Sequence, residues 1–235
     1  MIENNLKKIC VISTKDPTNI LIETVINLKK FYDDFDIVLV DSDSKDTNSN
    51  IFKMIPDFVK IEFIKNKNFE LGAYHYAFNK YDDYDVYMFI QDNFTPVNFY
   101  EFDYKNIVES DYLYFFKFRP TYTDYKTLPS LNYYIGSEFD YLTKIPNHSK
   151  VLGCLHNSFV TNKKIAKEIL KLENIYLEKN IKKTKKDSWL TEKTFAIVGS
   201  KHTNNIIDMQ PIGSYFIKTH GHRDYNKIGN KFFNF

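Results

Sequence analysis

Residues 36–44 read Asp-Ile-Val-Leu-Val-Asp-Ser-Asp-Ser, an apolar run that ends in a polar cluster. A short apolar run of this kind is typical of a buried β-strand. Three similar runs stand at 8–13, 59–64 and 86–90, and the last of them ends in the polar triplet at 91–93. The first hundred residues therefore predict four buried strands.

Helical segments separate these strands. Apolar residues recur at helical spacing from Ile20 to about Phe31, a short helix is expected from Asp46, and another helix over 72–80. Strands that alternate with helices predict βαβ units, and hence an α/β fold with a mostly parallel sheet and helices on both faces. Ligands of such sheets bind at the carboxyl ends of the strands, where the polar clusters after the second and fourth strands fall.

The second half of the chain is less regular. The patterns predict a weak strand over 111–118, a loop over 119–150, a strand or buried loop over 151–160, a helix over 162–179, a basic linker over 182–187, a helix over 188–198 and one or two short strands within 206–218. A composition shift near Pro96 divides a half at 1–96 from a half at 97–235. The length of 235 residues fits a single domain.

Composition excludes several classes of protein. Hydrophobic residues make up 43% and charged residues 26%, which argues against a disordered chain, a collagen or a disulfide scaffold. The net charge of +2 gives no electrostatic reason to expect a nucleic acid or an anionic membrane as partner. Cys10 and Cys154 are too few for a disulfide framework. Because no signal peptide and no apolar run of about 20 residues is visible, we expect a cytoplasmic protein without a transmembrane segment.

Three polar segments could carry chemistry. In the cluster at 40–46, carboxylates just past a parallel strand could accept hydrogen bonds from a nucleoside, although Asp and Ser are also common in such turns. Gly72, in the segment 66–73, could let a ligand approach the backbone at a helix entry. Asp92 ends a fully apolar strand, where a carboxylate could hold Mg²⁺ or Mn²⁺ on a diphosphate. Each segment could equally be an ordinary turn or helix entry.

Taken in order, these segments resemble the nucleotide-sugar-binding half of GT-A glycosyltransferases, especially family 2-like enzymes. Asp41, Ser44 and Asp46 match the family's V-D-D-G-S-x-D motif, whereas Ser42 and Asp43 depart from it. The segment 66–73 resembles the family's N-x-G-x-x-G-A segment. The triplet at 91–93 stands where the family has D-x-D, but it holds a single carboxylate.

The resemblance implies a Rossmann-like GT-A fold and a role for each matching residue. Asp41 would contact the base of a nucleoside diphosphate sugar, and Ser44 and Gly72 would belong to the same donor site. Asp92 would hold the divalent metal or the sugar. Because Gln91 and Asn93 replace the other acidic position, the metal is held more weakly, or another ligand helps, or no metal is used.

Two later segments complete the predicted site. In Lys218-Thr219-His220-Gly221-His222-Arg223, His220 is the preferred additional ligand for Mn²⁺, and Lys218 or Arg223 could neutralise phosphate. Inverting transferases need a carboxylate that deprotonates the acceptor hydroxyl. By similarity to the family, Glu192 is the best match for that base. Asp187 is the alternative, and could instead cap the helix.

The predicted function is transfer of a sugar from a nucleoside diphosphate sugar to a glycan or other hydroxyl acceptor, with inversion and with Mn²⁺ or Mg²⁺. One alternative is a protein of the same fold that binds the sugar nucleotide without catalysis. A nucleotidyltransferase would need a glycine-rich basic loop after the first strand, which 13–17 lacks. An interaction module that uses the aromatic second half is a further alternative. The lysine-rich run at 179–186 is typical of a solvated loop.

Overall fold

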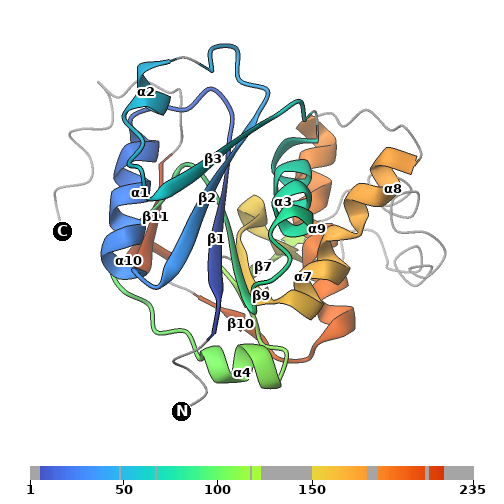
Figure 1. The fold of residues 1–235 in the computed structure, drawn as a ribbon. Coiled ribbons are helices and arrows are strands. Elements are labelled where there is room, and N and C mark those ends of the chain that lie inside the picture. The colour runs from blue at the N-terminus through green and yellow to red at the C-terminus, as the bar shows by residue number, and fades with distance from the viewer. Residues whose placement is uncertain are drawn as a thin grey trace, which may run out of the picture.

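The computed structural model describes residues 6–47, 49–66, 68–116, 118–122, 150–178, 185–209 and 212–219. Its centre is a seven-stranded sheet with the strand order β10-β6-β9-β4-β1-β2-β3 (Figure 1). The strands are β1 (Lys8–Thr14), β2 (Phe35–Ser42), β3 (Val59–Ile64), β4 (Val86–Gln91), β5 (Phe94–Pro96), β6 (Leu113–Phe115), β7 (Phe118–Tyr122), β8 (Lys150–Cys154), β9 (Phe159–Asn162), β10 (Ile206–Asp208) and β11 (Phe216–Lys218). The helices are α1 (Ile20–Phe31), α2 (Asn50–Lys53), α3 (Phe69–Lys80), α4 (Tyr104–Glu109), the 3₁₀ turn η4 (Leu155–Asn157), α7 (Lys163–Leu170), α8 (Leu172–Glu178), α9 (Lys185–His202) and α10 (Ile212–Tyr215).

Strand β1 lies at the middle of the sheet and is buried along its whole length. Its side chains alternate between two cores: Ile9 and Val11 pack with α3, α7 and α9, whereas Cys10 and Ile12 pack with α1 and α4. Because both faces are covered, the strand needs apolar residues at every position rather than at every second one. This explains why the strand pattern is a continuous apolar run.

The helices cover both faces of the sheet, as the sequence predicts. Figure 1 shows α1 on one side and α3, α7 and α9 on the other. Strands β1, β2, β3 and β4 run parallel to one another, while β9 runs antiparallel between β4 and β6. The predicted α/β fold with a mostly parallel sheet is confirmed.

The parallel register brings the ends of three strands to one edge. Thr14 at the end of β1 stands opposite Asp41 of β2, and Ser13 stands opposite Gln91 of β4. All three strands end within a residue or two of these pairs. The polar residues that follow the apolar runs are therefore neighbours across strands.

Several element boundaries differ from the sequence predictions. Helix α3 begins at Phe69, so Gly72 lies in its first turn and does not open it. Helix α9 begins at Lys185, so Asp187 lies inside the helix and the predicted linker at 182–187 is in part helical. The helix expected over 162–179 is two helices, with Lys171 between them. Helical spacing alone does not mark these boundaries, because apolar residues recur with the same period on both sides of Lys171.

The sequence patterns miss strand β5 and helix α4 and assign most of strand β7 to a loop. Strand β5 pairs with β11, more than one hundred residues away, and β7 pairs with β8 although 119–150 reads as a loop. Most of that stretch, 123–149, lies outside the described residues. The short helix α4 was not expected either. None of the helices in the described ranges has the length and apolar character needed to cross a membrane.

We expect Gly199→Ala to destabilise the fold, because α9 passes very close to β6 at this residue. A Cβ atom on Gly199 would lie 2.5 Å from Leu113 Cδ2 and 3.3 Å from Phe115 Cζ. Crowding of this kind costs about 1–3 kcal/mol. Urea denaturation measures the free energy of unfolding, and Ser200→Ala on the exposed side of the same turn is the control, with an expected change within about 0.5 kcal/mol. Equal stability of the two variants would contradict this packing.

Candidate functional site

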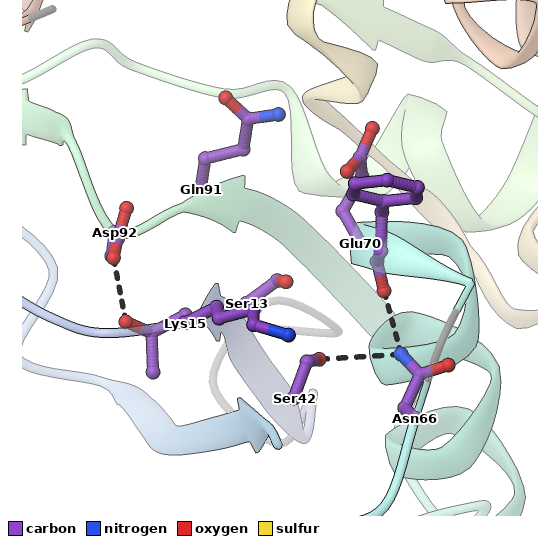
Figure 2. A pocket seen from close by; sticks show the side chains of 9 residues that line it. Ser13, Lys15, Ser42, Asn66, Glu70, Gln91 and Asp92 are labelled. Carbon is purple, nitrogen blue, oxygen red and sulfur yellow. Dashed lines mark hydrogen bonds between the residues drawn. The ribbon is translucent and has the colours of Figure 1, made fainter. Parts of the chain in front are cut away.

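A pocket of about 330 Å³ opens at the edge where β1, β2 and β4 end. Figure 2 shows Asp92 and Gln91 on one side of it, Asn66 and Glu70 on the other, and Ser13 and Ser42 between them. The lining side chains come from these three strand ends and from the start of α3: Ser13, Thr14, Lys15, Ser42, Asn66, Phe69, Glu70, Gln91 and Asp92. The pocket lies where the sequence analysis expects a ligand.

Asp92 is fixed from three directions. Its carboxylate Oδ2 accepts a hydrogen bond from Thr14 Oγ1 at 2.5 Å, its N–H donates to Ser13 O at 3.0 Å, and its carbonyl oxygen accepts from Thr24 Oγ1 at 3.2 Å. These three hydrogen bonds hold the carboxylate in place at the pocket wall. It is the one predicted site residue of the described part that lines this pocket directly.

Lys218 brings a positive charge to Gln91, the residue before Asp92. Its Nζ donates to Gln91 Oε1 at 2.9 Å and lies 5.1 Å from the centroid of the Phe94 ring. The pairing of β11 with β5 places it there, and the N–H of Thr219 donates to Asn93 O at 3.0 Å. The next residue, His220, lies outside the described residues, as do His222 and Arg223.

Asp41 and Ser44 hold the loops at this edge. Asp41 is buried, and its carboxylate accepts hydrogen bonds from the N–H of Ser44 at 3.0 Å and from the Ser44 hydroxyl. The Ser44 oxygen accepts from the N–H of Asp16 at 2.6 Å, and Asp16 Oδ1 accepts from the N–H of Lys45 at 2.9 Å. The loops after β1 and β2 are therefore tied together. Neither Asp41 nor Ser44 lines the pocket, whereas Ser42 does.

Gly72 makes room for Asn66. A Cβ atom at Gly72 would lie 2.2 Å from Asn66 Oδ1. The Asn66 side chain accepts from the N–H of Asn68 at 2.7 Å and donates to Phe69 O at 2.7 Å and to Ser42 Oγ at 3.2 Å. The absence of a side chain at Gly72 therefore leaves space for the Asn66 side chain, which lines the pocket.

Glu192 is connected to the pocket by η4. Its Oε1 accepts from the N–H of His156 at 2.8 Å, while the amide of the next residue, Asn157, donates to the pocket residue Glu70. Both His156 and Asn157 have left-handed backbone conformations, with φ of 70° and 52°. The consecutive residues His156 and Asn157 therefore hold the carboxylates of Glu192 and Glu70, respectively.

The protonation of Glu192 depends on this setting. Burial raises the pKa of its carboxyl above the ordinary value, and the negative charge of Glu70 acts in the same direction. The hydrogen bond from the His156 N–H and the charge of Lys218 oppose this rise in pKa. A carboxyl group with a raised pKa is a better proton acceptor when it is ionised. The Glu192 side chain is 20% exposed, so a proton donor can reach it.

The residues around Asp92 fit a cation that binds mainly through a substrate. The Asp92 carboxylate is a donor that Mg²⁺ and Mn²⁺ prefer, and Oδ1 of Asn93 is buried without a hydrogen-bond partner among the described residues. Within that same part of the chain, no group of three or more His, Cys, Asp and Glu side chains could hold a metal ion. Mg²⁺ commonly takes one or two carboxylates and completes its shell with phosphates and water.

Sequence reasoning missed the part of the site that depends on long-range contacts. Glu70 lies in the segment 66–73, but no spacing pattern in the sequence marks it as a site residue. Only its place as a charged residue on a buried helix face indicates a functional role. Asn157 and His156 meet the two glutamates across 87 and 36 residues of sequence. Their left-handed conformations are not predicted by the local pattern, because asparagine and histidine adopt a positive φ in only a minority of cases.

No protein-family profile and no curated protein sequence matches this chain. Solved structures do match it. Staphylococcus aureus TarS has a TM-score of 0.52 at 12% identity, over 92% of this chain and 37% of that one. The TarS 1–349 structure in complex with UDP-GlcNAc also has a TM-score of 0.52 at 12% identity, over 93% and 60%. Core-mannan synthase A (CmsA/Ktr4) from Aspergillus fumigatus, in a Mn/GDP form, has a TM-score of 0.50 at 12% identity, over 83% and 70%.

These likenesses define the class of fold. The chain has the α/β fold of GT-A-type glycosyltransferases, as its resemblance to that family implies. It spans less than two thirds of the length of TarS and of the TarS 1–349 fragment.

A double-mutant cycle tests the contact between Asn66 and Gly72. Gly72→Ala alone should cost about 1–3 kcal/mol, because the added methyl group forces Asn66 out of its three hydrogen bonds. In an Asn66→Ala background the same change should cost little, since the atoms it would meet are gone. The free energy of unfolding of the four proteins gives the coupling, expected at about 0.5–3 kcal/mol. An equal cost of Gly72→Ala in both backgrounds would show that Asn66 does not require the glycine.

Proposed function

We propose that this protein is a glycosyltransferase that moves a sugar from a nucleoside diphosphate sugar to a hydroxyl group of a glycan or other acceptor. The observation that carries the proposal is the pocket at the carboxyl ends of β1, β2 and β4, with Asp92 fixed at its wall. The fold agrees with it, since the similar structures include one solved with UDP-GlcNAc and one in a Mn/GDP form. The half at 1–96 would bind the donor, and the half at 97–235 the acceptor.

Asp92 and Lys218 are the groups proposed for the diphosphate. Asp92 would hold a divalent cation, Mn²⁺ or Mg²⁺, and His220 would add a ligand. When bound, that cation supplies Lewis-acid stabilisation of the leaving diphosphate. Lys218 and Lys15 would neutralise the remaining phosphate charge.

Asp41 and Ser44 would act on the nucleoside by fixing the two loops that border the pocket. Gly72 would act on it by leaving space for the Asn66 side chain.

Glu192 is the proposed base. Its carboxylate would accept the proton of the acceptor hydroxyl while the hydroxyl oxygen attacks the anomeric carbon. The bond from that carbon to the diphosphate oxygen breaks, and its electron pair leaves with the nucleoside diphosphate. Attack from the side opposite the leaving group inverts the anomeric centre. The hydrogen bond from His156 supports this role because it fixes the Glu192 carboxylate, and burial supports it because it raises the pKa of that group.

A cytoplasmic location stays a prediction.

The first test is binding and transfer with purified protein. A thermal-shift panel of UDP, GDP, CDP, dTDP and their sugar conjugates, each with Mn²⁺ or with chelator, identifies the donor class. A ligand at about 100 times its Kd should stabilise the protein by roughly 2.7 kcal/mol. Release of nucleoside diphosphate from the stabilising sugar conjugate then measures donor turnover. Binding without turnover would favour the sugar-nucleotide-binding protein, and no binding at all would overturn the proposal.

Asp92→Asn should remove turnover while it preserves the fold. The amide oxygen can still accept the hydrogen bond from Thr14, but it no longer provides a carboxylate for a cation or a sugar hydroxyl. We expect a loss of about 100-fold or more in kcat/KM, as for other removals of a group that stabilises developing charge. Asp57→Asn, an exposed change before the amino end of β3, is the matched control and should keep full activity. Full activity of the Asp92 variant would contradict its assigned role.

Glu192→Gln should separate catalysis from stability. Because the folded protein raises the pKa of Glu192, it holds this proton more tightly than the unfolded chain does. The resulting stability is complete below the ordinary value of 4.5 and is lost as pH rises through the raised pKa. Glutamine keeps the oxygen that accepts from His156 but carries no charge, so Tm should fall less between pH 4 and pH 7 in this variant than in the wild type. Turnover should be lost. Unchanged turnover would remove Glu192 as the base, whatever the change in Tm.

A further inference from the structure

We infer that Phe69 is a ligand-binding residue on which the nucleobase of the donor stacks. The inference rests on the proposed function and adds a residue to its donor site. Phe69 lines the pocket, the residue is 37% exposed, and its backbone has the left-handed φ of 53°. A bulky residue rarely adopts this conformation, because its Cβ is crowded by the backbone. An exposed aromatic ring held in an unfavourable conformation at a pocket needs an explanation.

The surroundings of Phe69 hold it in this conformation. The Asn66 side chain donates to Phe69 O at 2.7 Å and accepts from the N–H of Asn68 at 2.7 Å, so it spans the bend. Asn66 can occupy this place only because residue 72 is a glycine. Backbone strain of this kind persists where neighbouring contacts determine it, and it gathers at binding sites. Three residues therefore cooperate to present one ring to the pocket.

Phe69 differs from the aromatic residues of the core. Those pack against one another, as in Phe89 with Phe159 at 4.9 Å between ring centroids and Phe94 with Phe116 at 5.9 Å. Across the described ranges, none of the aromatic pairs includes Phe69. The ring is therefore available to a planar ligand, and an aromatic side chain gains from stacking with a nucleobase whatever the base.

The position of Phe69 relative to Asp92 favours the base over the sugar. Asp92 follows β4, whereas Asn66, which holds Phe69, bonds to Ser42 at the end of β2. The strand order is β4-β1-β2, so two strand spacings, about 10 Å, separate the two sides of the pocket. This distance is comparable with the length of a nucleoside. With the diphosphate at Asp92 and Lys218, the base reaches Phe69.

The test compares Phe69→Ala, Phe69→Gly and Phe69→Trp in calorimetric titrations with UDP, GDP and CDP, and with pyrophosphate, which has no base. Loss of the ring should raise the Kd of the nucleotide that binds the wild type by about 5- to 100-fold. It should leave the Kd of pyrophosphate unchanged. Phe69→Trp should keep the nucleotide Kd within about threefold of the wild type, and its added indole should be quenched on binding. Phe58→Ala, an exposed phenylalanine before the amino end of β3, is the control.

Phe69→Gly keeps the test decisive if the alanine variant folds poorly. Glycine adopts a positive φ without crowding, so this variant should melt at the wild-type temperature or above it while it loses nucleotide affinity. Nucleotide binding equal to the wild type in the folded glycine variant would overturn the inference and leave the proposed function standing. A wild-type protein that binds none of the nucleotides would overturn both. A matching loss of pyrophosphate binding would show that Phe69 shapes the pocket rather than contacts the base.

Discussion

The parallel register of β1 with β2 and β4 is the constraint on which the rest of the structure depends. Because β1 is buried on both faces and paired along both edges, its position fixes the ends of its two neighbours. Thr14, Ser42 and Gln91 are thereby brought to one edge of the sheet. The pocket is the space above these three ends. Its walls are built by segments that lie far apart in sequence but turn at the same edge.

The loops at this edge are held by side chains rather than by glycines. Six described residues other than glycine have a positive φ, and five of them stand where the chain turns around the carboxyl edge: Asp16, Asp43, Phe69, His156 and Asn157. The side chains of Asp41 and Ser44 accept hydrogen bonds from backbone N–H groups of the first two turns, and the Asn66 side chain donates to the carbonyl oxygen of Phe69. Left-handed conformations of this kind are costly singly, and their concentration at one edge indicates a site whose shape matters more than local stability.

The sequence predicts the sheet and its inner strands because burial on both faces leaves a simple signal, a short apolar run with polar ends. It also predicts the sheet edge at which the pocket opens, and it singles out Asp92, which lines that pocket. It does not predict the start of α3 or the pairing of β5 with β11, since these depend on contacts across the fold rather than on local pattern. For the same reason Glu70 gave no signal. The motif at Asp41 predicts a contact with the base, but it does not predict that the Asp41 carboxylate also accepts hydrogen bonds from the N–H and the hydroxyl of Ser44.

The departure from the family's D-x-D motif has a chemical consequence in the proposed donor complex. A carboxylate at residue 91 would attract Lys218 strongly and would also repel a diphosphate. The amide of Gln91 still accepts a hydrogen bond from Lys218 Nζ, at 2.9 Å, but adds no negative charge. Lys218 is thus held at Gln91, the residue before Asp92, and its charge also acts on Glu192 over a longer range. An edge with fewer carboxylates and a fixed ammonium group needs less charge from a cation to hold a diphosphate. In the proposed donor complex, a lysine supplied by β11 would thus contribute charge where the motif has one acidic position fewer.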